Sequence, residues 1–227
     1  MRLKTLFLPL FGLLAMSCDR QKEDVLDYVN PNLGTVHSRW FVYTPASEPF
    51  GLAKLGASTN GTYGNKDAWE AVGDEDGHNR IDGFPCLHEF QVGCVALMPI
   101  TGEAKTRPGL LENPEEGWRS TFQKSDEVAD AGYYSVVLQD YGIRTELTAT
   151  ARVGYQRYTF PASEDSHILL NIGNRQGESG AVRDARIEVV NPQTVQGYVV
   201  TEPEYVKKYQ KGPSVPMYFY ACFDTPF

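Results

Sequence analysis

A short segment, GFPCLHEFQVG (83–93), gathers side chains that can do chemistry. It holds a thiol at Cys86, an imidazole at His88 and a carboxylate at Glu89. On a strand, Cys86 and His88 point to the same side, so they could form a thiol nucleophile with its base, although no third group orients the imidazole. HEFQV also begins like the zinc-protease pattern HExxH. Its fifth residue is Val92, so the second histidine ligand is missing and this pattern is excluded.

The same segment and the irregular region before it contain residue types that can bind a sugar. Sugar sites use aromatic faces for the apolar side of a pyranose, and carboxylates, amides and imidazoles for its hydroxyls. The region 30–79 is rich in Gly, Asn, Pro, Trp and Asp, and long irregular segments inside compact domains are usually functional loops. We therefore favour carbohydrate binding, with these candidates for substrate contact: Trp40, Trp69, Phe84, His88, Glu89 and Gln91.

Structural alternatives exist for these candidates. Aromatic side chains in all-β proteins more often pack in the core than carry a ligand, which applies to Trp40 and Trp69. The His88 imidazole could instead hold its loop, and Glu89 could be a surface charge. DEDGH (74–78) resembles half of a calcium loop but lacks the ligand spacing and closing glutamate of an EF-hand, so a solvated turn is favoured.

The net charge of the chain indicates which kinds of partner are not expected. The chain has 227 residues and a net charge of −8, without a Lys/Arg-rich run. An acidic chain of this kind is not expected to bind nucleic acid. Its length suffices for one large all-β domain or two small ones.

The N-terminus is predicted to be an export signal. Arg2 and Lys4 precede an apolar run, Leu6–Met16, which is too short to span a bilayer as a helix. The run ends in AMSC, which resembles a bacterial lipobox with Cys18 as the acylated residue. We expect a signal peptide over 1–17, a polar tether over 18–26, and a lipid anchor as the only membrane contact. The protein would then be exported and held at the outer membrane or in the periplasm; a plain signal cleaved nearby is the alternative.

Three cysteines remain after Cys18, namely Cys86, Cys94 and Cys222. An odd number leaves at least one thiol unpaired. Cys86 and Cys94 could pair if their strands fold back on each other. Buried free thiols are the favoured prediction.

The rest of the chain predicts strands. Short runs with alternation or with β-branched and aromatic enrichment are separated by turn residues, and no amphipathic helix is evident. In 143–152, Ile143, Thr145, Leu147 and Ala149 fall on one face. The pattern indicates an antiparallel sandwich or barrel. The predicted strands are 92–100, 133–139, 143–152, 155–160, 167–173, 186–190, 194–200 and 217–223.

Several segments together resemble glycoside hydrolase family 92. DYVNPNLGT (27–35) and PASEPFGLAKLG (45–56) look like the N-terminal signature of that family. The family's GF…H…MP.TG pattern is present between Gly83 and Gly102. The closest likeness is DEVADAGYYSVVLQDYGIRTELTATARVGYQRYTFP (126–161). The resemblance covers the chain from Val25 onward.

The resemblance implies an exo-acting α-mannosidase. Such enzymes have an N-terminal β-sandwich, here 27–227 with a galactose-mutarotase-like supersandwich fold, packed on a C-terminal helical barrel. They remove terminal α-mannose from N-glycans or mannans with inversion, and calcium contacts the sugar. The catalytic acid, the base and most calcium ligands come from the C-terminal domain, which this chain lacks. We therefore expect a sandwich incomplete at its C-terminal end and a chain inactive alone; a free-standing glycan-binding surface lipoprotein is the alternative.

The resemblance also implies that the loop after Gly83-Phe84 lines the sugar pocket. Here His88 keeps its place, but the residues around it (85–91) and an earlier stretch (36–46) depart from the usual family forms, which leaves the linkage specificity open. We expect His88 to bind substrate by a hydrogen bond. Arg80 and Asp82 are predicted to pair and to brace the loop.

Overall fold

The structure, a computed structural model, consists almost entirely of β-strands. It describes residues 23–35, 43–59, 77–89, 92, 94–109, 114–173, 179–203, 206–210 and 214–227. The strands are β1 Ala46–Ser47, β2 Lys54–Leu55, β3 Arg80–Ile81, β4 Phe84–Pro85, β5 Ala96–Thr101, β6 Ser120–Thr121, β7 Val128–Asp130, β8 Tyr133–Leu138, β9 Ile143–Ala149, β10 Gly154–Thr159, β11 Ser166–Asn171, β12 Ala181–Asn191, β13 Thr194–Glu202 and β14 Val215–Cys222. Short helical turns lie at Val25–Tyr28, Pro114–Glu116, Lys124–Asp126 and Val206–Gln210.

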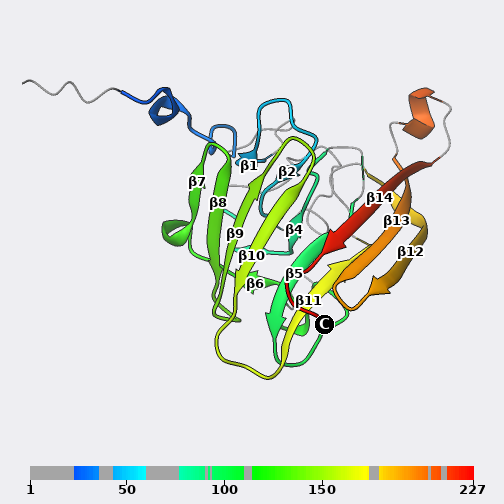
Figure 1. Ribbon diagram of the computed structural model, residues 1–227. Helices are drawn as coiled ribbons and strands as arrows, with labels where there is room; N and C mark the ends of the chain where they lie inside the picture. Colours follow the sequence, from blue (N-terminus) through cyan, green and yellow to red (C-terminus); the bar gives the residue numbers. More distant parts are fainter. Residues whose placement is uncertain are drawn as a thin grey trace, which may run out of the picture.

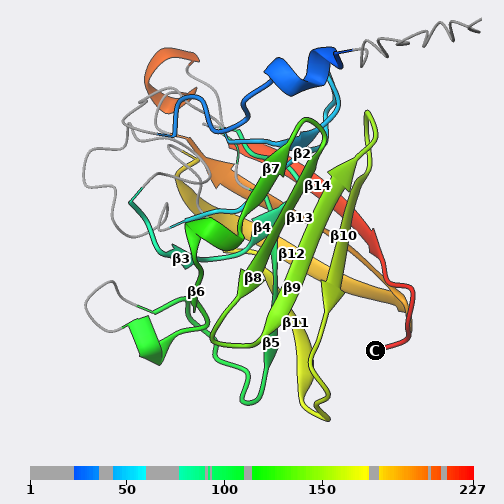
Figure 2. The ribbon, with the colours of Figure 1, turned by 90° about the vertical axis from the view of Figure 1, so that its left-hand side faces the viewer.

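The strands form antiparallel sheets arranged as a β-sandwich, as the sequence predicts. One sheet has the order β10-β9-β8-β7, a second β11-β5-β4 and a third β12-β13-β14, and the pairs β1-β2 and β3-β6 are small additions. Figures 1 and 2 show the β7–β10 sheet on one side of the molecule and the β12–β14 sheet on the other, with β5 and β11 between them. Among the described residues, no helix is long and apolar enough to cross a membrane.

The β8–β9–β10 meander follows its sequence closely. Leu138 and Ile143 face each other across a tight turn in which Gly142 adopts a φ of +64°, a conformation that favours glycine. Along β9, Ile143, Thr145 and Leu147 are buried while alternate residues are more exposed, which confirms the predicted face. Burial of each large aliphatic side chain contributes about 1.5–3 kcal/mol.

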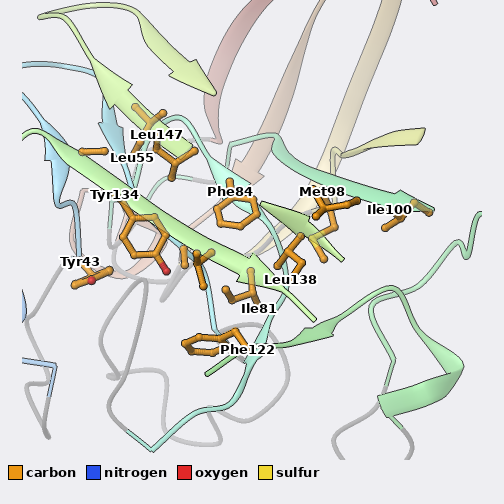
Figure 3. Close-up of a cluster of buried hydrophobic side chains, with 14 of the residues drawn as sticks. Tyr43, Leu55, Ile81, Phe84, Met98, Ile100, Phe122, Tyr134, Leu138 and Leu147 are labelled. Carbon is orange, nitrogen blue, oxygen red and sulfur yellow. The ribbon is translucent and has the colours of Figure 1, made fainter. Parts of the chain in front are cut away.

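The core lies between the β7–β10 sheet and the layer that contains β4 and β5. The side chains labelled in Figure 3 come from strands and connections far apart in the sequence, and all are almost fully buried. They are Tyr43, Leu55, Ile81, Phe84, Met98, Ile100, Phe122, Tyr134, Leu138 and Leu147. Tyr43 and Tyr134 meet edge to face, with ring centroids 6.0 Å apart.

The β12–β14 sheet has one apolar and one polar face. On β13, Val195 and Val199 are buried while Gln196 and Tyr198 between them are half-buried. β14 continues this alternation, because Met217 and Phe219 are less exposed than Tyr218 and Tyr220. The strands predicted at 186–190, 194–200 and 217–223 are therefore confirmed; the first two are longer than predicted, and the third begins two residues earlier and ends one residue earlier.

Candidate functional site

The structure brings together two segments that the sequence analysis singled out separately. β4 pairs with β5 through Phe84 and Leu97, and the chain then turns alongside β2. The Lys54 amide donates to the carbonyl of Cys86, and the His88 amide donates to the carbonyl of Lys54, each at 3.0 Å. These bonds join the 45–56 motif to the 83–89 segment. The candidate site is therefore the face where these two stretches meet.

His88 is the central polar group of this site. Its side chain is fully buried, and Nδ1 lies 3.4 Å from the carbonyl oxygen of Lys54. A carbonyl only accepts, so this contact requires the proton on Nδ1 and leaves Nε2 as a hydrogen-bond acceptor. Within the described part of the chain, Nε2 has no hydrogen-bond partner. Burial lowers the pKa of His88 to about 4, and the contact with Lys54 opposes this shift only in part. The imidazole is therefore neutral near pH 7.

Phe84 belongs to the core rather than to an exposed surface. Its ring has no exposed area and lies 6.5 Å, between centroids, from the ring of Tyr158 on β10. The Gln156 side-chain amide donates to the Phe84 carbonyl at 3.1 Å, and the Tyr158 hydroxyl donates to the Gln156 amide oxygen. A fully buried ring offers no face to a sugar in this structure. The role that the geometry supports for Phe84 is to hold the segment on which His88 lies.

The other predicted contacts are placed only in part. Glu89 follows His88 and is half-buried. Trp40, Trp69 and Gln91 lie outside the described residues, as does the predicted lipidation site Cys18. Of the predicted contacts, His88 and Glu89 thus lie on the described part of the 83–89 segment, and substrate contact by all these residues stays a prediction.

A buried ion pair braces the start of the segment, but not the pair we predicted. Asp82 pairs with Arg119, whose Nε donates to one carboxylate oxygen and whose Nη2 lies 3.4 Å from the other. Trp118 Nε1 donates to the Asp82 carbonyl at 2.9 Å. Arg80 instead lies 3.8 Å from Asp140. The predicted Arg80–Asp82 pair was wrong because β3 aligns with β6, which brings Arg119 and its neighbours against Asp82.

The thiols do not form an activated nucleophile. Cys86, Cys94 and Cys222 are free, which confirms the prediction of unpaired thiols. Burial raises the pKa of Cys86, and burial followed by the proximity of Cys86 raises the pKa of Cys94 to about 12. A protonated thiol and an imidazole of lowered pKa are poorly suited to nucleophilic catalysis. Burial was predicted wrongly for Cys222, which is exposed near the end of edge strand β14.

The described residues do not fit a metal site. Among them, no three His, Cys, Asp or Glu side chains lie close enough together to hold an ion. Most of DEDGH (74–78) lies outside the described residues. The calcium implied by the resemblance therefore finds no ligand set in the described part of this chain.

Sequence reasoning missed the partners that position the site. The Lys54 carbonyl, Gln156 and Arg119 each hold part of the 82–88 segment from another element. No local pattern indicates these contacts, since they follow from strand alignment. The alternation of β10 offered one signal, because it places Gln156 and Tyr158 on the same face.

The family model and the solved structures that match this chain belong to the same family. Residues 28–227 match the model described as the glycosyl hydrolase family 92 N-terminal domain. A family GH92 α-mannosidase from Bacteroides thetaiotaomicron, solved alone and in complex with mannoimidazole, is 28% identical with a TM-score of 0.76 in both structures. An inverting mannosidase of the same family and organism is 22% identical with a TM-score of 0.58, which supports the fold. No curated protein matches the chain.

These matches differ greatly from this chain in length. The two structures of the first α-mannosidase align with 90% of this chain but only 26% of their own, and the inverting mannosidase aligns with 78% and 23%. The chain thus spans about a quarter of the solved structures that it resembles. The family model covers nearly all of the chain, including β1 to β14 and the 83–89 segment. The chain therefore belongs to glycosyl hydrolase family 92, as its N-terminal domain.

Proposed function

We propose that this chain forms one wall of the sugar site of an exo-acting α-mannosidase. Its substrate would be terminal α-mannose of N-glycans or mannans, and hydrolysis would proceed with inversion. The proposal rests on family membership, and the observation that carries it to a residue is the acceptor at His88 Nε2, which has no hydrogen-bond partner among the described residues. Because the His88 side chain is buried in this structure, its segment would have to open for a sugar hydroxyl to reach Nε2. A neutral imidazole nitrogen without a partner can accept a hydrogen bond from a sugar hydroxyl. Such a bond is stronger in a buried, low-dielectric site than in water.

The catalytic groups are proposed to lie outside this chain. Inverting hydrolysis needs one carboxylic acid to protonate the leaving oxygen and one carboxylate to activate water, about 6.5–9.5 Å apart. We assign both, together with most of the calcium ligands, to a C-terminal helical domain. The part played by this chain is to position and desolvate the sugar through the 83–89 segment.

Two measurements test the proposal. Membrane fractions of the source cells are blotted with an antibody raised against residues 27–160; we expect a band several-fold larger than the 25.3 kDa of this chain. When the cells are grown with labelled palmitate, the same band should carry the label if Cys18 is acylated. A single band near 25.3 kDa would contradict the proposal and favour a free-standing glycan-binding lipoprotein.

The role of His88 is tested in the longer product. His88→Ala should reduce release of mannose from an α-mannoside by about tenfold or more, since a buried hydrogen bond to substrate is lost. The purified chain of 227 residues should release none. Calcium-dependent release by this chain alone would refute the assignment of the catalytic groups to another domain.

A further inference from the structure

The outer face of the β12–β14 sheet carries an ordered set of aromatic and polar side chains. Strand register places them in two rows, one of Arg186, Tyr198 and Tyr218 and the other of Glu188, Gln196 and Tyr220. We refer to these six residues as the tyrosine face. Figure 1 shows this sheet separated from the β8–β9–β10 meander by β5 and β11.

Two of the three tyrosines of this face, Tyr218 and Tyr220, are exposed although the opposite face of the sheet is apolar. Tyr218 is 75% exposed and Tyr220 is 65% exposed, while Val195 and Val199 on the opposite face are buried. Residues two apart on a strand lie about 7 Å from each other, so Tyr218 and Tyr220 form neighbouring platforms. The rings of Tyr198 and Tyr218 are 6.0 Å apart and tilted by 56°. Burial among the described residues therefore does not explain these rings.

The polar groups of the face already neutralise one another in part. Arg186 lies 3.5 Å from Glu188, and the Tyr198 hydroxyl donates to the neighbouring Asp184 at 2.9 Å. With one arginine and two carboxylates, the surface is slightly acidic, like the chain as a whole with its charge of −8. Such a surface repels anionic polymers, whereas its carboxylates and amide accept and donate hydrogen bonds to neutral hydroxyl groups.

From these observations we infer that the tyrosine face binds a neutral oligosaccharide chain, at a second site separate from the 83–89 segment. Exposed aromatic rings bind the apolar faces of pyranose rings. Glu188, Gln196 and Arg186 beside them bind the hydroxyls at the ring edges. The site would hold a polysaccharide near the enzyme without taking part in bond cleavage.

Native gel electrophoresis of the full chain, with α-mannan, dextran or the anionic polymer polygalacturonate in the gel, tests this inference. We expect α-mannan or dextran to retard the parent chain and polygalacturonate to have no effect. Tyr218→Ala with Tyr220→Ala should weaken binding at least about tenfold, as loss of an aromatic anchor does. The corresponding double change to Phe should retain most of the binding, because the ring faces remain.

Tyr155→Ala is the matched control, since Tyr155 is 55% exposed on β10 of the other sheet. Equal binding by the parent and the double Ala variant would overturn the inference, as would no retardation by either neutral polymer. A parent dimer that the double Ala variant abolishes would also overturn it and assign the face to a second copy. The readout depends neither on catalysis nor on His88, so its failure and the failure of the proposed function are distinguishable.

Discussion

At the residue scale, the ion pair of Asp82 and Arg119 is the strongest polar brace of the site. Both side chains are almost completely buried. Arg119→Met would leave the Asp82 carboxylate in the core without this partner. We expect the free energy of unfolding to fall by about 3–5 kcal/mol, measured by urea denaturation.

Arg157→Met provides the control for that variant. Arg157 makes two 2.7 Å bonds to Glu146 but is 74% exposed, so solvent replaces much of what is lost. Its effect should be far smaller than that of Arg119→Met. Equal losses from the two variants would show that burial does not determine the strength of the Asp82 pair.

His88 should make stability depend on pH in a defined window. An unfolded chain binds a proton at histidine below about pH 6.5, whereas folded His88 binds one only below about pH 4. Between these values the unfolded state holds more protons, so stability is lost as the pH falls from 6.5 to 4. The shift corresponds to about 3 kcal/mol.

We expect His88→Gln to flatten the curve of unfolding free energy against pH between 6.5 and 4. His167→Gln, at an exposed position on β11, should leave the slope of the parent unchanged. The slope is the readout because either substitution can change the absolute stability. Parallel curves for the parent and His88→Gln would contradict the buried neutral imidazole.

At the element scale, the close approach of β10 to the 83–89 segment depends on Gly154. A Cβ at this position would lie 2.5 Å from Cys86 Sγ and 2.7 Å from Leu55 Cδ1. Gly154→Ala should therefore force apart β10 and β2 and lower the free energy of unfolding by about 1–3 kcal/mol, measured by denaturation. Gly173→Ala is the control, since its Cβ would meet only Asn171 Oδ1 at 3.7 Å. If Gly154→Ala leaves the free energy of unfolding unchanged, this contact is loosely packed.

Elements with a strong local pattern were predictable from the sequence. The 133–160 meander shows alternation and turn residues in register with its buried face, and the structure reproduces it within a few residues. The very short strands β1 to β4 and β6 were not predicted, because two residues carry no periodicity. Their positions depend on long-range pairings such as Lys54 with Leu87 and Ser58 with Gly83.

His88 could be singled out from the sequence, but the residues that position it could not. His88 was identified from its place in the GF…H…MP.TG pattern. Its burial, tautomer and contact with Lys54 arise from tertiary packing, which no local pattern records. Asp82 was singled out with the wrong partner for the same reason, since the separation from Arg119 along the chain is 37 residues.

At the scale of the whole molecule, the sheets should differ in local stability. β8 and β9 bury most of one face in the main core, whereas nearly all of β12 is exposed. Elements with few buried apolar contacts open by local fluctuation at a lower free energy. We expect amides of β12 to exchange with deuterium much faster than those of β9, as measured by mass spectrometry of peptic peptides.

β10 is the matched comparison for β12, because it is also an edge strand but packs Tyr158 against the core. Slower exchange in β10 than in β12 would separate the effect of core packing from that of edge position. Uniform protection across β9, β10 and β12 would contradict this difference and indicate that the sheets unfold as one cooperative unit.

The contrasting environments of Cys86, Cys94 and Cys222 suit them to selective labelling in a chain without Cys18. Cys94 is buried with a pKa near 12 and Cys86 is half-buried with a raised pKa, so both react slowly with maleimides near neutral pH. Cys222 is exposed on the same side of β14 as Tyr218 and Tyr220. A fluorophore attached there would report directly on any polymer that settles on the neighbouring tyrosines.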